Sequence, residues 1–322
     1  MPKGLFTAAA CLLTDGRTTL SGLKDALSNA GLEIAKEVPA SESWAISGPS
    51  LVVPYQREQN GCAAVDLVEL PWPDAMGDPK SDVMTFGAWT MGHFGPFTFP
   101  GGLQRATQHC WMCEAGPTIA DGHRGFVRVR IGYGFGASGD HLLIPPGYDP
   151  LEELTFLNRV VSALFAARGI VCYFNPNGEV LRDEESFRRD CEHSRNQGLP
   201  PLPVWSNTRL FNLSDEFGFL DTVGNHQLDI RDIEAIFPSA QYEPAAIENY
   251  LGNVTLYLHG LDREMKTGES IDGPGETGLT WTLELADEGV TSPPRSVLRL
   301  NPRSNRSRTL IQNESLRAAP PC

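Results

Sequence analysis

The fold of this 322-residue chain is decided by residues 203–259, PVWSNTRLFNLSDEFGFLDTVGNHQLDIRDIEAIFPSAQYEPAAIENYLGNVTLYLH. Val204–Leu213 is rich in Trp, Thr, Leu and Phe, which favour strands, and Phe217–Val223 follows after a turn at Asp215–Glu216. These segments predict a β-hairpin. A hairpin needs a helix or a further sheet on its apolar face.

Two helices are predicted to supply that cover. The first is Gln227–Phe237, with Asp229 as its N-cap and Pro238 ending it. The second starts at Pro244, a residue suited to the first helical position. Its apolar residues recur at helical spacing up to the stop at Gly260, and they are Ile247, Tyr250, Leu251, Val254 and Leu258.

Acids and a histidine gather in the same stretch. Asp221, His226 and Asp229 are the candidate catalytic residues, because carboxylates beside an imidazole perform acid–base work or bind a divalent cation. The structural alternative is that Asp229 caps a helix and Asp221 ends a strand. Structural networks of this kind also perturb acids.

The net charge and the cysteine content indicate which class of partner and which cellular compartment to expect. A formal net charge of −14 and a pI near 4.9 disfavour nucleic acid and anionic membrane and favour a neutral or basic protein partner. Seven cysteines form an odd set without the spacing of a disulfide scaffold, which predicts a reducing, cytoplasmic location. The run before Cys11 is too short for a usual export signal and is predicted as a buried strand. No apolar run is long enough to span a bilayer.

Residues 1–102 are predicted to form a β-α-β-β-β block. Its predicted elements are strand Leu5–Leu13, helix Thr18–Ala30, and strands Leu32–Val38, Trp44–Ser47, Ser50–Tyr55 and Ala63–Leu70. The Pro-, Gly- and aromatic-rich segment 71–102 is predicted as a loop that covers a core or lines a pocket. Trp89 and His93 are its candidate binding residues.

Two further motifs are candidate sites. Leu103–Cys113 is predicted as a helix that carries Cys110 and Cys113, a spacing found in redox pairs and in half of a zinc site. Cys191 and His193 are the alternative second half of such a site, although buried thiols are the default and no cofactor is predicted. Phe126–Tyr133 alternates apolar residues with Arg128 and Arg130, which predicts a strand with one solvated face. The two arginines are candidate anion ligands or partners of local carboxylates.

Residues 103–302 are predicted as a second α+β block, integrated with the first. Its predicted elements are helix Pro150–Arg168, strand Ile170–Phe174, surface helix Asp183–Arg195 and the closing strands Leu279–Leu285 and Ser296–Leu300. The fold class is therefore α+β, with two strand-helix-strand blocks and mixed or antiparallel sheets packed by amphipathic helices. Residues 303–322 are predicted to be a disordered basic tail.

Several segments together resemble a bacterial domain-of-unknown-function family, the one catalogued as four-two-six-one. The segments are FGPFTFPGGLQRATQHCW, GFVRVRIGY, CYFNPNGEVL, PVWSNTRLF, DTVGNHQLDIRDIEAIF, SIDGPGETGLTW and PPRSVLRLNP, between about Trp89 and Pro302. The resemblance implies a bacterial origin, a cytosolic setting and one integrated α+β fold. It transfers no catalytic residue.

Two functions from different classes follow. The first is a non-enzymatic acidic protein-binding factor, such as an immunity or accessory protein that caps a basic partner. The alternative is a hydrolase that uses the Asp221 and His226 region or a zinc ion held by Cys110, Cys113, Cys191 and His193. The chain lacks a nucleophile elbow, a P-loop, an H-E-x-x-H motif and a G-x-G-x-x-G motif that opens a helix after a strand. A third possibility is a small-ligand module roofed by segment 71–102.

Overall fold

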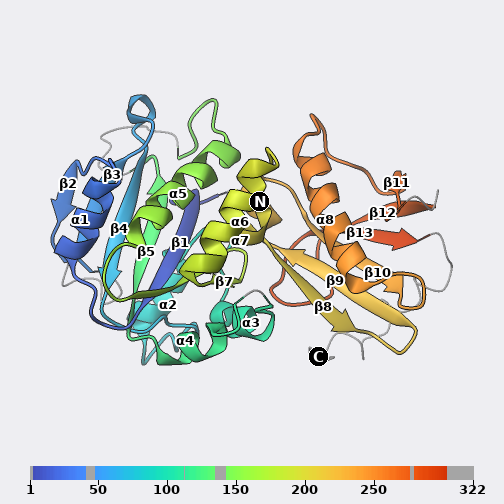
Figure 1. Cartoon of the computed structure of the whole chain (residues 1–322), viewed down its shortest axis with the longest axis horizontal. Helices are drawn as coiled ribbons and strands as arrows, with labels where there is room; N and C mark the ends of the chain where they lie inside the picture. Colours follow the sequence, from blue (N-terminus) through green and yellow to red (C-terminus); the bar gives the residue numbers. More distant parts are fainter. Residues whose placement is uncertain (1–2, 41–47, 112, 135–142, 276–278, 303–322) are drawn as a thin grey trace. The chain divides into compact units, whose positions relative to one another are not determined.

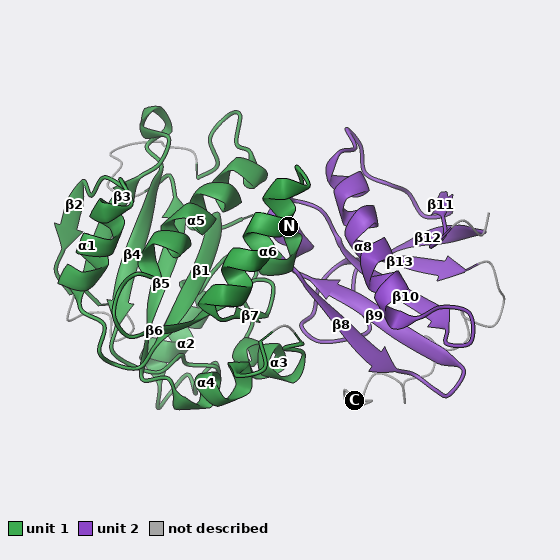
Figure 2. Ribbon diagram, viewed as in Figure 1, with its two compact units in different colours: residues 1–205 green, residues 206–322 purple. Residues whose placement is uncertain are grey.

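The computed structural model describes residues 3–40, 48–111, 113–134, 143–275 and 279–302. The chain divides into two compact units, unit 1 (residues 1–205) and unit 2 (residues 206–322) (Figure 2). The boundary therefore falls at Trp205 and not after residue 102 as predicted. The reason is that the strand after segment 71–102 inserts between strands of the predicted first block. The predicted strand 44–47 and the tail 303–322 lie outside the described residues.

Unit 1 is built on an antiparallel sheet of seven strands in the order β2-β3-β4-β5-β1-β6-β7 (Figure 1). These strands are β1 (Ala8–Thr14), β2 (Lys36–Val38), β3 (Ser50–Pro54), β4 (Cys62–Val68), β5 (Gly125–Gly132), β6 (Ile170–Asn175) and β7 (Val180–Arg182). Both predicted strand-helix-strand blocks, β1-α1-β2 and β5-α5-β6, are present, and both belong to this one sheet.

Helices on one face of this sheet begin at the signals that the sequence carries. They are α1 (Leu20–Asn29), α5 (Pro150–Leu164) and α6 (Glu184–Asn196). The side chain of Asp149 accepts from the amide of Leu151 at the start of α5, and Asp183 accepts from Ser186 at the start of α6. Helix α5 packs on β1 and β5, and α6 packs on β6 and β7.

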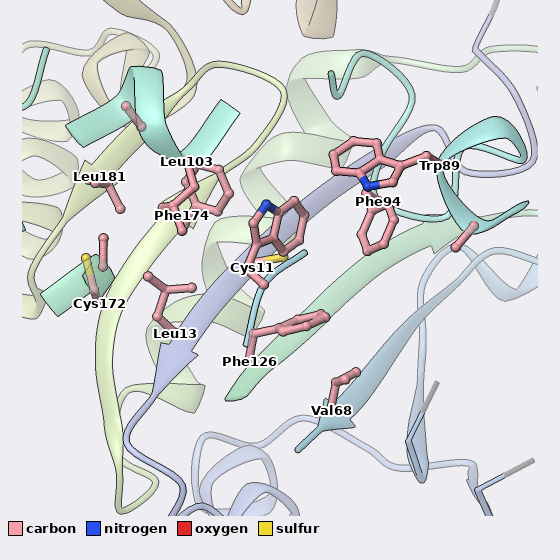
Figure 3. Close-up of a cluster of buried hydrophobic side chains, with 14 residues drawn as sticks. Cys11, Leu13, Val68, Trp89, Phe94, Leu103, Phe126, Cys172, Phe174 and Leu181 are labelled. Carbon is pink, nitrogen blue, oxygen red and sulfur yellow. The ribbon is translucent and has the colours of Figure 1, made fainter. Parts of the chain in front are cut away.

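The opposite face of the sheet is covered by the segment between β4 and β5. It contains α2 (Val83–Thr90), α3 (Gly102–Gln108) and α4 (Gly116–Gly122), so the predicted loop 71–102 includes a helix and the predicted helix 103–113 ends at Gln108. Trp89 and Phe94 from this segment pack with Cys11, Phe126 and Phe174 of the sheet (Figure 3). The segment covers a core, which confirms the first of its two interpretations.

Strand β5 has no solvated face, contrary to the prediction. All of its residues are buried, because helix α5 covers one side and the 71–124 segment covers the other. Arg128 and Arg130 therefore point into the protein. Their guanidinium groups lie over the rings of Phe94 and Phe6.

Unit 2 is a mixed sheet of six strands in the order β11-β12-β13-β10-β9-β8, with one helix on its face. Unit 1 ends with the helical turn α7 (Leu202–Trp205). The elements of unit 2 are β8 (Asn207–Asn212), β9 (Phe217–Val223), the 3₁₀ helix η2 (Asn225–Leu228), β10 (Asp232–Pro238), α8 (Pro244–His259), β11 (Ser270–Asp272), β12 (Thr280–Ala286) and β13 (Val297–Pro302). Among the strands that the structure describes in this unit, β10 and β13 are the pair that runs in parallel. The α+β class with mixed and antiparallel sheets is confirmed.

The predicted helix 227–237 is wrong. Residues 232–238 form the central strand β10 instead, because Ile233, Ala235 and Phe237 alternate toward α8 while Glu234 and Ile236 point to the other face. Asp229 ends η2 in the left-handed conformation, with φ 60°. The hairpin β8–β9 and the helix α8 with Pro244 in its first turn are confirmed, although β8 starts at Asn207 after the helical turn α7.

No helix among the described residues is both long and apolar enough to cross a membrane.

Candidate functional site

A row of charged side chains crosses the sheet of unit 2 on the face opposite α8. Backbone pairing places Arg209 beside Asp221, Asp221 beside Glu234, Glu234 beside Arg299, and Arg299 beside Glu284. We call these five residues the charge row. Asp221 and Glu234 stand directly opposite each other, an arrangement that is destabilising unless cations compensate it.

Arginines supply that compensation at Asp221. Arg209 binds the carboxylate with two hydrogen bonds, Nε to Oδ1 at 2.9 Å and Nη2 to Oδ2 at 2.6 Å. Arg295 adds a third at 2.6 Å. Burial alone would raise the pKa of Asp221, but the two arginines outweigh it and hold this pKa below its ordinary value. Asp221 is therefore an ionised structural acid.

Glu234 is held by the strand on its other side and by the connection between β12 and β13. Arg299 donates to it from Nε at 2.8 Å, and the amide of Val290 donates at 2.5 Å. Burial nevertheless raises the pKa of Glu234. The same connection lies over Asp221, where the hydroxyl of Thr291 donates to the carboxylate and Arg209 donates to the carbonyl of Ser292 at 2.8 Å. The charge row thus fixes residues 287–296 across this face.

The three candidate catalytic residues do not meet. His226 lies in η2 with its Nε2 3.8 Å from Oδ2 of Asp232, and burial lowers the pKa of His226. Asp229 is exposed. Arg295, and not His226, joins the two buried aspartates, because it contacts Asp221 at 2.6 Å and Asp232 at 3.4 Å. Asp232 in turn accepts from the amide of Asn225 and the hydroxyl of Thr222, which holds the η2 turn.

The arginine pair of unit 1 also has a buried counter-charge, Asp66 on β4. Arg128 Nε donates to Asp66 Oδ2 at 3.1 Å and Arg130 Nη2 donates to the same oxygen at 2.6 Å. Burial opposes ionisation of Asp66, yet the two arginines lower its pKa below the ordinary value. The alternative that these arginines pair with a local carboxylate is the one that this geometry favours.

Trp89 and His93 flank this group. The indole of Trp89 is buried and donates to the carbonyls of Pro73 and Ala75. The carbonyl of His93 accepts from Arg130 at 3.3 Å. The pKa of His93 is lowered to about 4, chiefly by burial and further by the charges of Arg130 and Arg128.

This environment predicts a pH-dependent loss of stability that His93 controls. Because the imidazole stays neutral in the folded state but titrates near 6.5 when unfolded, its stabilising effect is complete above about pH 6.5 and declines as the pH falls toward 4. We expect unit 1 to lose roughly 1–2 kcal/mol more between pH 7 and pH 5 than a His93→Gln variant, a range that allows for partial solvent screening. Hydrogen exchange of β5 peptides at both pH values measures the difference. The exposed His193→Gln variant is the control, and an equal loss in all three proteins would contradict the prediction.

The cysteines of the C-x-x-C motif meet a third thiol and not the predicted zinc partners. Cys113 contacts Cys172 on β6 and lies 3.8 Å from a carboxylate oxygen of Asp183. Cys191 lies elsewhere, on α6, in a pocket of about 620 Å³ beside α5, and His193 is exposed. Within the described residues, no group of three or more His, Cys, Asp and Glu side chains is arranged to hold a metal ion.

Sequence reasoning missed the residues that organise these groups. Asp66, Cys172 and Arg295 lie far along the chain from their partners, and no local spacing marks them. The one sequence signal that pointed to Asp66 is the pair of arginines two residues apart on β5. A buried strand that carries two cations needs a carboxylate nearby.

Exposed charge differs sharply between the two units. In the described part of unit 2, ten exposed acids stand against two exposed cations, Arg263 and Lys266. Unit 1 exposes thirteen acids and eleven cations. The exposed acids of unit 2 are Asp215, Glu216, Asp229, Glu243, Glu248, Asp262, Glu264, Asp272, Asp287 and Glu288. The net negative charge of the exposed residues therefore lies mainly on unit 2.

Comparison with known proteins places a family match in the same unit. Residues 221–301 match the family model described as Domain of unknown function (DUF4261), which confirms the sequence resemblance over that region. The match begins at Asp221, includes Glu234, Glu284 and Arg299 of the charge row, and ends within β13. No curated protein and no solved structure matches the chain.

Proposed function

We propose that this chain is a non-enzymatic protein-binding factor whose unit 2 caps a basic protein partner, in the manner of an immunity or accessory protein. The observation that carries the proposal is the ratio of ten exposed acids to two exposed cations among the described residues of unit 2. Surface charge of one sign speeds and orients association with a partner of the opposite sign.

The buried charges support the same conclusion. Asp221, Glu234 and Asp232 are the acids that chemistry would need, and each already has a cationic or hydrogen-bonding partner inside the unit. Arg209 and Arg295 bind the buried carboxylate of Asp221, so their positive charges do not offset the negative charges of the exposed acids. The charge row supplies rigidity beneath the surface, and the exposed carboxylates supply the attraction. The hydrolase alternative stays a prediction, with His226 beside Asp232 as its nearest pair.

Neutralising exposed acids of unit 2 is expected to weaken partner binding. The variant Glu243→Gln, Asp262→Asn, Asp287→Asn, Glu288→Gln should bind roughly tenfold or more weakly at low ionic strength, because four attractive charges are lost. The matched control neutralises four exposed acids of unit 1, Asp25→Asn, Glu58→Gln, Glu69→Gln and Asp121→Asn, and should bind as the wild type does. Both variants change the net charge by the same amount.

The measurement is affinity capture from native lysate at low and high salt, followed by titration of the purified partner. We expect a basic protein whose affinity falls steeply with salt and falls further in the unit 2 variant alone. Recovery of no protein, binding insensitive to salt, or equal weakening by both variants would argue against the proposal.

A further inference from the structure

Three cysteine side chains from distant parts of the sequence meet under the turn that follows α3. Cys110 and Cys113 lie in that turn, where the Cys110 thiol donates to the carbonyl oxygen of Cys113 at 3.2 Å. Cys172 on β6 lies beside Cys113 on the sheet side, and its thiol hydrogen-bonds to the carbonyl oxygens of Tyr173 and Arg182 at 3.3 Å. Figure 3 shows Cys172 within the hydrophobic cluster of this face.

Gly116, the first residue of α4, lies against the sulfurs of both Cys110 and Cys113. A Cβ atom added at Gly116 would lie 2.7 Å from the sulfur of Cys110 and 3.4 Å from that of Cys113. A side chain at position 116 would therefore displace the sulfurs, and the bare glycine allows both to sit against the same backbone atom. Cys110 is half-buried, while Cys113 and Cys172 are buried, so a reagent from solvent reaches Cys110 first.

The neighbouring sulfurs act on the two groups in opposite directions: contact with Cys113 raises the pKa of Cys110, and contact with Cys110 and Cys172 lowers the pKa of Cys113. The Cys113 thiol also donates to a carboxylate oxygen of Asp183 at 3.8 Å. The thiolate is the reactive form in disulfide exchange.

We propose that Cys110 and Cys113 form a reversible dithiol–disulfide site that reacts with low-molecular-weight disulfides. In the first step Cys110, the more accessible thiol, loses its proton and its sulfur attacks one sulfur of the reagent RSSR, so that RS⁻ leaves. In the second step Cys113 loses its proton and attacks the Cys110 sulfur, and a second RS⁻ leaves. The two RS⁻ groups take up the two protons, so that the dithiol and RSSR yield the protein disulfide and two RSH.

The other cysteines provide internal controls. Burial raises the pKa of Cys11 to about 12 and that of Cys191 to about 11. Cys191 is half-buried like Cys110, but it has the amide of Asn158 as its neighbour at 3.9 Å. We therefore expect Cys191 to remain a thiol under conditions that oxidise the pair.

Trypsin makes the test direct, because Cys110 and Cys113 share the peptide 106–124, while Cys172 lies in peptide 169–182 and Cys191 in peptide 190–195. The full chain is reduced, equilibrated with glutathione and glutathione disulfide at a series of ratios, alkylated and digested. We expect peptide 106–124 to lose two hydrogens and to escape alkylation at ratios where peptide 190–195 stays alkylated. Returning to reduced glutathione should restore both labels.

Three variants fix the assignment. Cys172→Ser should still give the two-hydrogen loss in peptide 106–124, and Cys191→Ser should behave as the wild type. Cys110→Ser should abolish the loss while the fold, followed by circular dichroism, is retained. Full alkylation of both cysteines at every ratio, or a disulfide that joins peptide 106–124 to peptide 169–182, would overturn the proposal.

Discussion

Replacing Asp221 by Asn is expected to destabilise unit 2 by about 3–5 kcal/mol. The substitution preserves the shape of the side chain but removes the charge on which Arg209 and Arg295 converge. Both guanidinium groups are almost completely buried, at 1% and 4% exposure, so neither can recover the lost interaction from water. The urea dependence of hydrogen exchange in β9 and β10 peptides measures the change within unit 2.

Asp229→Asn is the matched control for this prediction. Asp229 lies in the same unit but is exposed, so its neutralisation should change stability by no more than about 0.5 kcal/mol. Combining Asp221→Asn with Arg209→Gln should cost less than the two single changes added together, by about 1–3 kcal/mol, because the second change removes one of the uncompensated cations. Strict additivity, or an Asp221→Asn effect as small as that of the control, would show that the charge row does not stabilise the sheet.

Lowering the pH is expected to reduce the difference in stability between the wild type and Asp221→Asn. The pKa of Asp221 is held below its ordinary value in the folded protein, so its stabilising effect is present above the unfolded pKa and is lost as the pH falls through the folded pKa. The gap between wild type and Asp221→Asn is therefore expected to persist at neutral pH and to narrow only in strong acid.

The elements that could be predicted from sequence are those whose signals are local. Helix α5 follows Asp149 and Pro150, and α8 follows Pro244, so cap and first-turn residues mark both starts. The hairpin of β8 and β9 was marked by composition and by the turn at Asp215. Each of these signals lies within a few residues of the element that it starts.

Strand β10 shows why other elements were mispredicted. On sequence grounds Asp229 is predicted as the N-cap of a helix that Pro238 ends. In the structure Asp232 caps the η2 turn, and Ile233 lies in a strand that pairs with β9 on one side and β13 on the other. The pairing partner β13 is more than sixty residues away in sequence, so tertiary pairing decided the conformation here.

The partners of the candidate site residues could not be predicted from the sequence for the same reason. Asp221 is a candidate catalytic residue on sequence grounds, but its partners Arg209 and Arg295 come from β8 and from the connection before β13. Cys110 and Cys113 were recognised by spacing, whereas Cys172 reaches them only because β6 and β7 lie beneath α3 and α4. Side-chain type and spacing identified the candidates, and the topology determined their partners.

The corresponding substitution in unit 1, Asp66→Asn, is expected to cost about 3–5 kcal/mol as well. Asp66 is the shared acceptor of Arg128 and Arg130, and burial already lowers the pKa of Arg130 to about 10. Without the carboxylate, two like charges would remain side by side between β5 and the 71–124 segment, which disfavours closing that segment over the sheet. Hydrogen exchange of β4 and β5 peptides should report the loss.

Glu69→Gln provides the control for this change, because Glu69 follows the end of β4 and is exposed. It should leave the exchange of the same peptides within about 0.5 kcal/mol of wild type. Adding Arg130→Gln to Asp66→Asn is expected to recover about 1–3 kcal/mol relative to the sum of the single effects, since only Arg128 then lacks a counter-charge. If Asp66→Asn were tolerated as well as Glu69→Gln, the stacking of Arg128 and Arg130 on Phe94 and Phe6 would be sufficient to hold the two guanidinium groups.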